Sequence, residues 1–317
     1  MTTLACDLGG TRMKIGLVRE GAVQAQTTLR ANSQAGLIPG LPALKAAWLR
    51  LLGESNLSVR DCDGISVAFP SLVDIQSGRI LAEYGKYADA MSFDFCAWAK
   101  AEFNLPLAIE NDARMALVGE WKHGAGRGLD NVVMITLGTG LGTAAVIEGR
   151  LLRGKHGQAG VLGGHNTVRY AGRVCTCGNV GCAEAEASTA YLRQMAEGVP
   201  EWASSSLQKF AALNYAVVFE HAEAGDRCAL KLREHSSRVW ATLAVNMIHA
   251  YDPEIVILGG GVMASAAVVL PAIDEYVQRH AHTPWGKVRV VAGELGDLAA
   301  LIAGEWLLQE QHPKIIK

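Results

Sequence analysis

The sequence predicts an α/β protein made of two related halves. Two stretches share one design, an apolar strand, a turn that contains Leu-Gly and a second apolar strand, and they span Leu4–Val18 and Asn131–Ile147. They lie roughly one domain length apart, which indicates an internal duplication. A chain of 317 residues is long enough for two domains with separate cores. In both halves, further apolar strands run into segments with helical spacing.

Composition limits the possible classes of protein. Hydrophobic residues make up 50% of the chain and charged residues 19%, which is typical of a globular protein and excludes a disordered one. The formal net charge of −2 offers no basic field for DNA or RNA. Neither a signal peptide nor an apolar run of ~18 residues is visible. We therefore expect a cytoplasmic protein that binds neither nucleic acid nor membrane.

The central hairpin is the first candidate binding element. Its apolar runs flank a turn that holds Gly138, Thr139 and Gly140. Glycines let backbone N–H groups approach a ligand closely, and a nest of such donors suits a phosphate. A tight hairpin without a ligand is the alternative. The second copy near the N-terminus favours phosphate binding, because two facing hairpins across a cleft would hold the phosphates of a nucleotide.

The N-terminal hairpin carries the same turn with charged neighbours. Gly9, Gly10 and Thr11 form its turn, and Asp7 ends its first strand. A carboxylate there would repel phosphate directly, so we expect Asp7 to hold Mg²⁺ or its water shell. Lys14 offers a positive charge to ATP, or is a solvated strand residue.

The next elements frame a possible substrate pocket. The spacing predicts a core-packing helix over 41–52 and a loop over 81–91. Residues 63–74 are a buried strand that runs into a Phe-Pro-Ser turn. Ligands usually lie where strands of an α/β sheet end, which makes Pro70, Ser71 and Asp74 candidates for lining a substrate pocket.

A second strand end carries the candidate catalytic residue. Residues 105–112 read as a strand and 113–121 as a helix, with Asn111 and Asp112 at the junction. Asp112 is either an N-cap or a general base, and the two roles are compatible. In phosphoryl transfer an aspartate accepts the proton of the attacking hydroxyl.

A cluster of thiols and one imidazole predicts a metal site. Three cysteines fall within eight residues, with glycines between them, and a histidine lies ten positions earlier. The expected ligands are His165, Cys175, Cys177 and Cys182. A Cys₃His set suits tetrahedral Zn²⁺ in a closed, structural site. The alternative is a glycine-rich loop with uncoordinated cysteines. Glu184 or Glu186, which follow at once, could bind a substrate hydroxyl.

The C-terminal part predicts more helix and one further glycine turn. Residues 191–251 read as helical, with breaks at 198–200 and 224–226. A buried strand over 254–262 ends in Gly259, Gly260 and Gly261, a third place for the backbone to approach a nucleotide. A strand over 288–291 and a helix over 297–308 complete the chain, and Asp297 is a candidate cap of that helix.

Taken together, these stretches resemble the ROK (repressor, open reading frame, kinase) family of sugar kinases. The matches occur in family order over nearly the whole chain. They are Asp7-Leu-Gly-Gly-Thr11, Asn111-Asp112, Leu137-Gly-Thr-Gly-Leu-Gly142, Cys175-x-Cys-Gly-x-x-Gly-Cys-x-Glu184 and Leu258-Gly-Gly-Gly261. The resemblance implies a two-domain actin-like ATPase fold, related to ribonuclease H, with an interdomain ATP and sugar cleft. The smaller domain would comprise residues 1–111 plus about 298–317, and the larger one residues 112–297.

The resemblance also implies an activity and roles for the candidate residues. The protein would transfer the γ-phosphoryl group of ATP, with Mg²⁺, to the primary 6-hydroxyl of a hexose or related polyol. Asp112 would be the general base, Asn111 would bind neighbouring hydroxyls, and Glu184 would bind the sugar near C1 or C2. His165 would ligate zinc and shape the sugar site. The resemblance to this family also implies a homodimer.

Two departures from the family pattern bear on the substrate. The family motif Glu-x-Gly-His appears as Val161-Leu-Gly-Gly-His165, without its Glu, and Ser71 replaces a glycine after Pro70. Losing a carboxylate from a sugar site removes charge-assisted hydrogen bonds of about 1.5–3 kcal/mol each. This argues against glucose and leaves fructose, mannose, an amino sugar or a cyclitol compatible.

Two other functions are open. A sugar-responsive repressor would need a DNA-binding extension before the first hairpin, and the hairpin begins at Leu4. An inactive sugar-binding protein is disfavoured because Asp7 and Asp112 are both present.

Overall fold

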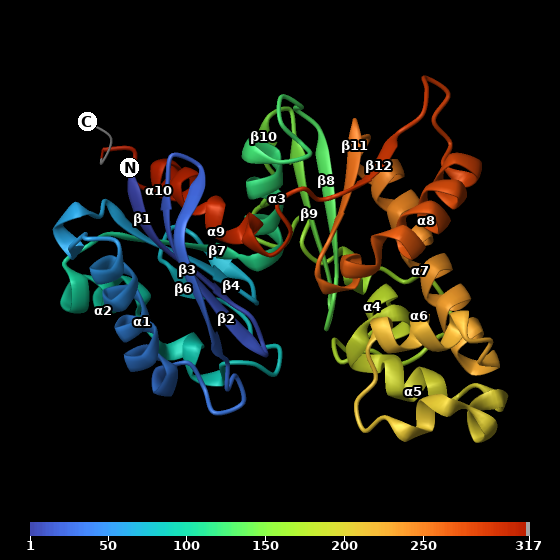
Figure 1. Cartoon of the computed structure of the whole chain (residues 1–317). Helices are drawn as coiled ribbons and strands as arrows, with labels where there is room; N and C mark the ends of the chain where they lie inside the picture. The colour runs from blue at the N-terminus through green and yellow to red at the C-terminus, as the bar shows by residue number, and fades with distance from the viewer. Residues whose placement is uncertain (315–317) are drawn as a thin grey trace. The chain divides into compact units, whose positions relative to one another are not determined.

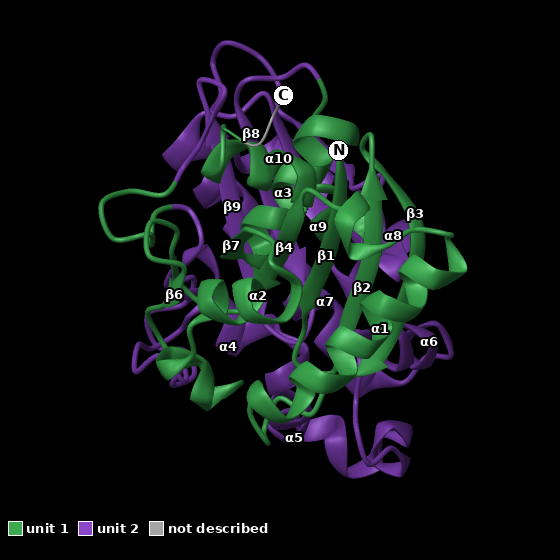
Figure 2. Ribbon diagram, turned by 90° about the vertical axis from the view of Figure 1, so that its left-hand side faces the viewer, with its two compact units in different colours: residues 1–127, 153–159, 297–317 green, residues 128–152, 160–296 purple. Residues whose placement is uncertain are grey.

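The structure, a computed structural model, describes residues 1–314 and divides the chain into two compact units. Figure 1 shows their secondary structure, and Figure 2 colours the two units separately. Unit 1 comprises residues 1–127, 153–159 and 297–317, and unit 2 comprises 128–152 and 160–296. Each unit is built on one five-stranded sheet.

The elements of unit 1 come from both ends of the chain. Its strands are β1 (Thr2–Leu8), β2 (Arg12–Arg19), β3 (Ala22–Arg30), β4 (Gly64–Phe69), β5 (Val73–Asp74), β6 (Arg79–Ile80) and β7 (Leu107–Asn111). Its helices are α1 (Leu41–Glu54), α2 (Phe95–Phe103), α3 (Asp112–His123), α9 (Ala299–Ile302) and α10 (Gly304–Gln311). The main sheet has the order β3-β2-β1-β4-β7, and β5 pairs with β6 in a separate ribbon.

Alternate residues of β1 serve the two faces of this sheet. Leu4, Cys6 and Leu8 pack with the buried side of α1, including Trp48, whose indole N–H donates to the Ala5 carbonyl at 3.2 Å. On the other face Ala5 packs against α9. A strand that is buried on both faces is typical of an α/β layer, so the sheet edge is left to carry the polar groups.

Unit 2 repeats the plan with larger helices. Its strands are β8 (Val132–Leu137), β9 (Leu141–Ile147), β10 (Arg150–Leu151), β11 (Ile255–Gly259) and β12 (Arg289–Ala292). Its helices are α4 (Ala183–Ala187), α5 (Leu192–Glu197), α6 (Tyr215–Glu223), α7 (Arg227–Tyr251) and α8 (Ala266–His280). The sheet order is β10-β9-β8-β11-β12.

The two sheets have the same topology, which confirms the predicted duplication. In each unit three antiparallel strands in chain order form one side, and two parallel strands follow the first of them. The glycine turns that were predicted as hairpins join β1 to β2 and β8 to β9. Each turn therefore lies at the carboxyl ends of the parallel strands of its own sheet, where α/β proteins place their ligands.

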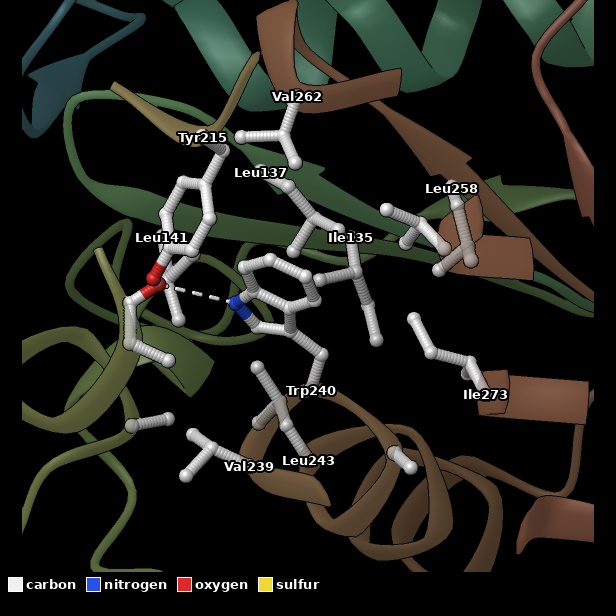
Figure 3. Packing of buried hydrophobic residues seen from close by; sticks show 14 of the residues in the cluster. Ile135, Leu137, Leu141, Tyr215, Val239, Trp240, Leu243, Leu258, Val262 and Ile273 are labelled. Atoms are coloured by element: carbon white, nitrogen blue, oxygen red, sulfur yellow. Dashed lines mark hydrogen bonds between the residues drawn. The ribbon is translucent and has the colours of Figure 1, made fainter. Parts of the chain in front are cut away.

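The core of unit 2 is centred on Trp240 of α7. Figure 3 shows this indole between the strand residues Ile135 and Leu137 on one side and the helix residue Leu243 on the other. Its N–H donates to the Ala187 carbonyl at 3.0 Å, which ties the end of α4 to the core. The short helix that carries Glu184 is thus held by buried packing.

The helical prediction for 191–251 needs correction. The structure has three α-helices there, with additional 3-10 turns over Pro200–Ser204 and Ser206–Lys209. Both predicted breaks, at 198–200 and at 224–226, are present, but the first continues to the start of α6 at Tyr215, and this extension was missed. Asp226 contributes to this extension, because its carboxylate caps α7 and also accepts from Ser205 and Ser206, which favours 3-10 turns over an α-helix there.

Two further predictions differ from the structure. The helix expected over 297–308 is split into α9 and α10, and Asp297 does not cap it but pairs with Lys14. The unit boundary lies after residue 127 and not after 111, because α3 packs on the sheet and on α9 of unit 1. Across residues 1–314, every helix is too short or not apolar enough to cross a lipid bilayer.

Candidate active site and metal centre

Strand register in unit 1 brings three strand ends that carry predicted site residues to one edge of the sheet. Asp7 on β1 lies opposite Ala68 of β4, and Phe69 at the end of β4 lies opposite Asn111 of β7. Pro70 and Ser71 follow β4 directly, and Asp112 follows β7. The parallel pairing therefore gathers the ends of all three strands, as expected from their sequence positions.

The Asn111–Asp112 junction is held by a small hydrogen-bond network. Asn111 is the N-cap of α3, since its side-chain oxygen accepts from the Arg114 N–H, and Asp112 is the first helical residue. The prediction of Asp112 as the cap is therefore wrong. The Asn111 amide donates to the Ser71 carbonyl at 3.2 Å and to Asp112 Oδ1 at 3.1 Å. Asn111, Ser71 and Asp112 thus form one connected group.

One oxygen of Asp112 is left available for chemistry. Oδ1 accepts from the Ala113 N–H at 2.8 Å and from Asn111, whereas Oδ2 has no side-chain or other-residue donor within residues 1–314. Burial raises the pKa of Asp112 to about 6, and the charge of Asp7 adds to the rise, while Lys86 opposes it. A carboxylate with this pKa is ionised at neutral pH and still binds a proton well, which suits a general base.

The charges around the first glycine turn are partly neutralised within unit 1. Lys14 Nζ lies 3.2 Å from Asp7 and 3.1 Å from Asp297. Burial raises the pKa of Asp7, and Lys14 acts against this rise. Burial lowers the pKa of Lys14, but the two carboxylates outweigh it and leave that pKa raised. Lys14 is therefore an ion-paired side chain rather than a solvated one, and Asp297, which was predicted as a helix cap, is one of its partners.

A buried ion cluster that the sequence did not indicate includes residues on either side of Asp112 in the chain. Glu110 and Arg114 are both fully buried and lie 3.2 Å apart, and Arg153 reaches the other oxygen of Glu110 at 2.7 Å. Arg114 also donates to the Gly157 and Ala159 carbonyls. The cluster fixes the segment 153–159 to the strand that ends in Asn111. An i,i+4 charge pair across a strand–helix junction is the one local signal that could have revealed it.

The second glycine turn lies against the helix that carries Glu184. The carbonyls of Gly138 and Thr139 accept from the N–H groups of Thr189 and Ala190. Glu184 Oε2 accepts from the Leu141 N–H at 3.0 Å. Glu184 therefore contacts the hairpin directly, within one unit.

The third glycine run lies beside the same turn. Gly259 ends β11 and pairs with Thr136 of β8, one residue before the turn begins. Gly260 and Gly261 lead into the 3-10 helix Gly261–Ser265 ahead of α8. Unit 2 thus brings the predicted ATP-binding glycines 138, 140 and 259–261 together at one sheet edge.

The four predicted metal ligands form one cluster. Their ligand atoms all lie within 4.8 Å of one another. The Cys177 and Cys182 sulfurs are 3.7 Å apart, and Cys175 Sγ lies 3.6 Å from His165 Nδ1. Tetrahedral zinc with Zn–S of about 2.3 Å and Zn–N of about 2.0 Å requires ligand separations of about 3.5–3.8 Å. The donor set and these two separations therefore suit Zn²⁺ in a closed site.

Glu186 has a structural position rather than a substrate-facing one. It is fully buried, accepts from the Arg173 N–H and guanidinium, and lies 3.3 Å from His235. Of the two carboxylates considered from the sequence, Glu184 alone remains a candidate for the sugar. Glu186 instead anchors the loop that precedes the cysteine cluster.

Comparison with known proteins identifies the family. The ROK family profile matches residues 3–311. This chain belongs to the ROK family. It is 30% identical to a glucokinase of Halalkalibacterium halodurans, over 98% of this chain and 96% of the relative. It is 31% identical to a glucokinase of Thermotoga maritima, over 97% of each chain.

A solved ROK structure agrees with the fold. The crystal structure of a ROK family glucokinase from Streptomyces griseus in complex with glucose and AMPPNP matches with a TM-score of 0.81 and 29% identity. The match covers 96% of this chain and 99% of that one. The predicted two-domain actin-like ATPase fold is thereby confirmed. Within this ROK protein, the glycine turns, Asn111-Asp112 and the cysteine cluster are the stretches from which the family was inferred.

Proposed function

We propose that this ROK protein is an ATP-dependent sugar kinase that phosphorylates the primary hydroxyl of a hexose or related polyol. The near full-length similarity to glucokinases supports a phosphotransferase with an alcohol acceptor. The observation that carries the proposal is Asp112: a carboxylate at a strand end, beside Asp7, with its Oδ2 open to an acceptor hydroxyl.

Asp112 acts as the general base. Its Oδ2 accepts the proton of the acceptor hydroxyl while the oxygen of that hydroxyl bonds to the γ-phosphorus. The bond from the γ-phosphorus to the bridging oxygen breaks, and ADP leaves with the electron pair of that bond. Asn111 and the Ala113 N–H hold Oδ1, so the carboxylate keeps its orientation. In unit 1, Asn111 binds the acceptor and Pro70 and Ser71 line it. In unit 2, the candidate contacts to the sugar are Glu184 and His165.

The glycine turns bind the nucleotide. Gly9, Gly10 and Thr11 in one unit and Gly138, Thr139 and Gly140 in the other offer N–H and hydroxyl groups to phosphate. Gly259, Gly260 and Gly261 approach the nucleoside. Asp7, with Lys14 beside it, is suited to Mg²⁺ or its water shell, and Mg²⁺ would neutralise phosphate charge.

The decisive experiment is a coupled ADP assay over glucose, fructose, mannose, amino sugars and cyclitols. Asp112→Asn should lower kcat about 10²- to 10⁴-fold on the best acceptor, the range for removing a general base. Asp252→Asn, at an exposed aspartate after α7, is the matched control and should keep wild-type turnover. Normal turnover by Asp112→Asn would refute Asp112 as the general base.

The second candidate is an inactive sugar-binding protein. The missing Glu in Val161-Leu-Gly-Gly-His165 is the observation that favours it, because one acceptor-binding carboxylate is absent. Calorimetry with the same sugars separates the two. Sugar binding without ADP formation in the presence of Mg²⁺ and ATP would support the second function.

We also propose that His165, Cys175, Cys177 and Cys182 hold one structural Zn²⁺. The donor set and two of the distances between ligand atoms support a tetrahedral ion, and a bound ion would fix the loop that carries His165. Elemental analysis should find one zinc per chain, and removal by a chelator should lower the thermal midpoint. Cys96→Ser, at an exposed cysteine outside the cluster, should leave the zinc content unchanged. Protein purified without chelators and free of zinc would contradict the assignment.

We also propose that the protein is a homodimer and that it lies in the cytoplasm. The requirement for ATP supports a reducing, ATP-containing compartment, and so does an odd number of cysteines of which four are scattered singly along the chain. Light scattering on the purified protein should give twice the 33.7 kDa mass of one chain. A mass of one chain would refute the dimer.

A further inference from the structure

The loop between β6 and α2 brings a lysine to the first glycine turn. Residues 81–91 were predicted only as a loop, and no motif marks Lys86. In the structure Lys86 Cε lies so close to Gly10 that a Cβ at position 10 would be 2.8 Å from it and 3.4 Å from Nζ. The absence of a side chain at Gly10 is therefore what gives the Lys86 side chain its place.

The residues on either side of Lys86 are fixed to the segment that carries the turn. The Gly85 carbonyl accepts from Gln34 Nε2 at 2.7 Å, and the Tyr87 N–H donates to the Ser33 carbonyl at 2.8 Å. The Tyr87 hydroxyl, on a buried ring, donates to the Gly9 carbonyl at 2.9 Å. Four hydrogen bonds, including one from Ser33 Oγ to the Gly10 carbonyl, thus hold Lys86 over the turn.

The ammonium group of Lys86 is not used by the protein itself. Within residues 1–314 no carboxylate or carbonyl accepts a hydrogen bond from its Nζ, whereas Lys14 nearby is paired with two carboxylates. Lys86 is partly buried, and its charge lowers the pKa of Asp112, against burial and the charge of Asp7. Its positive charge therefore acts at both the glycine turn and the catalytic carboxylate.

We propose that Lys86 is a catalytic residue that binds the phosphoryl group during its transfer. This inference rests on the proposed kinase function. The transferring group must lie between the phosphate-binding turn and the oxygen that Asp112 deprotonates. The Lys86 side chain lies against that turn, and its charge acts on Asp112. During transfer the bond from the acceptor oxygen to the γ-phosphorus forms, the bond to the ADP oxygen breaks, and the acceptor proton goes to Asp112. Lys86 keeps its own protons and neutralises charge on the equatorial phosphoryl oxygens.

The test compares Lys86→Met and Lys86→Arg with the wild type in the ADP assay. Lys86→Met should lower kcat about 10²- to 10³-fold, as for the loss of one transition-state donor, with KM for ATP and sugar changed far less. Lys86→Arg keeps the charge and should recover most of the rate. Lys100→Met, at an exposed lysine on α2, is the control and should match the wild type.

The pH profile separates this role from a structural one. Asp7 on β1 raises the pKa of Asp112 and Lys86 lowers it, so removing Lys86 should move the acid limb of kcat/KM to higher pH. A thermal midpoint equal to that of the wild type shows that Lys86→Met is folded. If the wild type is active and Lys86→Met is equally active, the role of Lys86 is refuted and the kinase function is not. A wild type that phosphorylates no acceptor would overturn the proposed kinase function itself.

Discussion

The two glycine turns occupy equivalent positions in duplicated sheets and yet differ in chemistry. The turn between β1 and β2 is surrounded by charges, with Asp7, Lys14 and Lys86 close to it. The turn between β8 and β9 has one close carboxylate, Glu184, which accepts from the Leu141 N–H at 3.0 Å. The first turn thus carries ionic groups suited to chemistry, and the second offers mostly backbone and hydroxyl groups suited to binding.

This difference teaches how a duplicated fold can separate roles. Both turns keep the strand order and the glycines, so both can approach phosphate. What differs is the set of side chains that neighbouring loops and helices add. In unit 1 the end of β4 adds Pro70 and Ser71, whereas the end of the corresponding strand of unit 2, β11, adds glycines before a 3-10 helix. The end of β7 adds Asn111 and Asp112 to unit 1.

Each unit contains a buried, ion-paired carboxylate, Glu110 in unit 1 and Glu186 in unit 2. The largest effect of a substitution is expected at Glu110. Replacing Glu110 with Gln removes the carboxylate paired with Arg114, which is itself fully buried, so the free energy of unfolding should fall by about 3–5 kcal/mol. Glu186→Gln should cost less, about 1–3 kcal/mol, because Arg173 and His235 are partly exposed and can reach water.

Urea unfolding of the two variants and the wild type measures both values. Glu102→Gln, which removes a partly exposed partner of Lys45, should change the unfolding free energy by less than about 1 kcal/mol and serves as the surface control. An equal loss of unfolding free energy in Glu110→Gln and Glu186→Gln would show that the buried ion pairs of the two units contribute equally to stability.

The pH dependence of stability tests the charged site directly. The pKa of Asp112 is raised from 3.8 to about 6 in the folded protein, so the folded state binds its proton more tightly than the unfolded state. That stabilising contribution is complete below pH 3.8 and is lost as the pH rises through about 6. Asp112→Asn should therefore be more stable than the wild type at pH 8, by about 1–3 kcal/mol.

The difference should disappear as the pH falls to about 4, where Asp112 is protonated in the folded wild type. Unfolding curves at several pH values measure it, and Asp252→Asn is the control. A stability difference that stays constant between pH 4 and pH 8 would show that Asp112 is not a desolvated carboxylate.

Local sequence patterns were enough for much of the fold and for part of the candidate site. Glycine turns between apolar runs predicted both hairpins, and spacing alone predicted the cluster of His165 with the three cysteines. Such features are encoded within ten to twenty residues, where hydrophobic periodicity and ligand spacing are visible. That the cluster holds a metal ion stays a prediction.

Features that depend on distant contacts were missed. Lys86 lies in a loop without periodicity, and its place depends on Ser33, Gln34 and Gly10. Asp297 was read as a helix cap because it precedes a helical stretch, but its partner Lys14 is 283 residues away. Sequence patterns report on local geometry, whereas ion pairs between elements are decided only once the sheet is assembled.

The smallest expected effect concerns the second turn. A Cβ at position 140 would lie 2.4 Å from Glu184 Oε2, the oxygen that accepts from the Leu141 N–H, whereas a Cβ at position 138 would have its nearest neighbour 3.9 Å away. Gly140→Ala must push a flexible carboxylate aside and should cost about 1 kcal/mol of stability, since one hydrogen bond is lost. Gly138→Ala should be neutral or slightly stabilising, because it restricts the unfolded chain. If urea unfolding gave the larger loss for Gly138→Ala, Glu184 would not be what shapes the second turn.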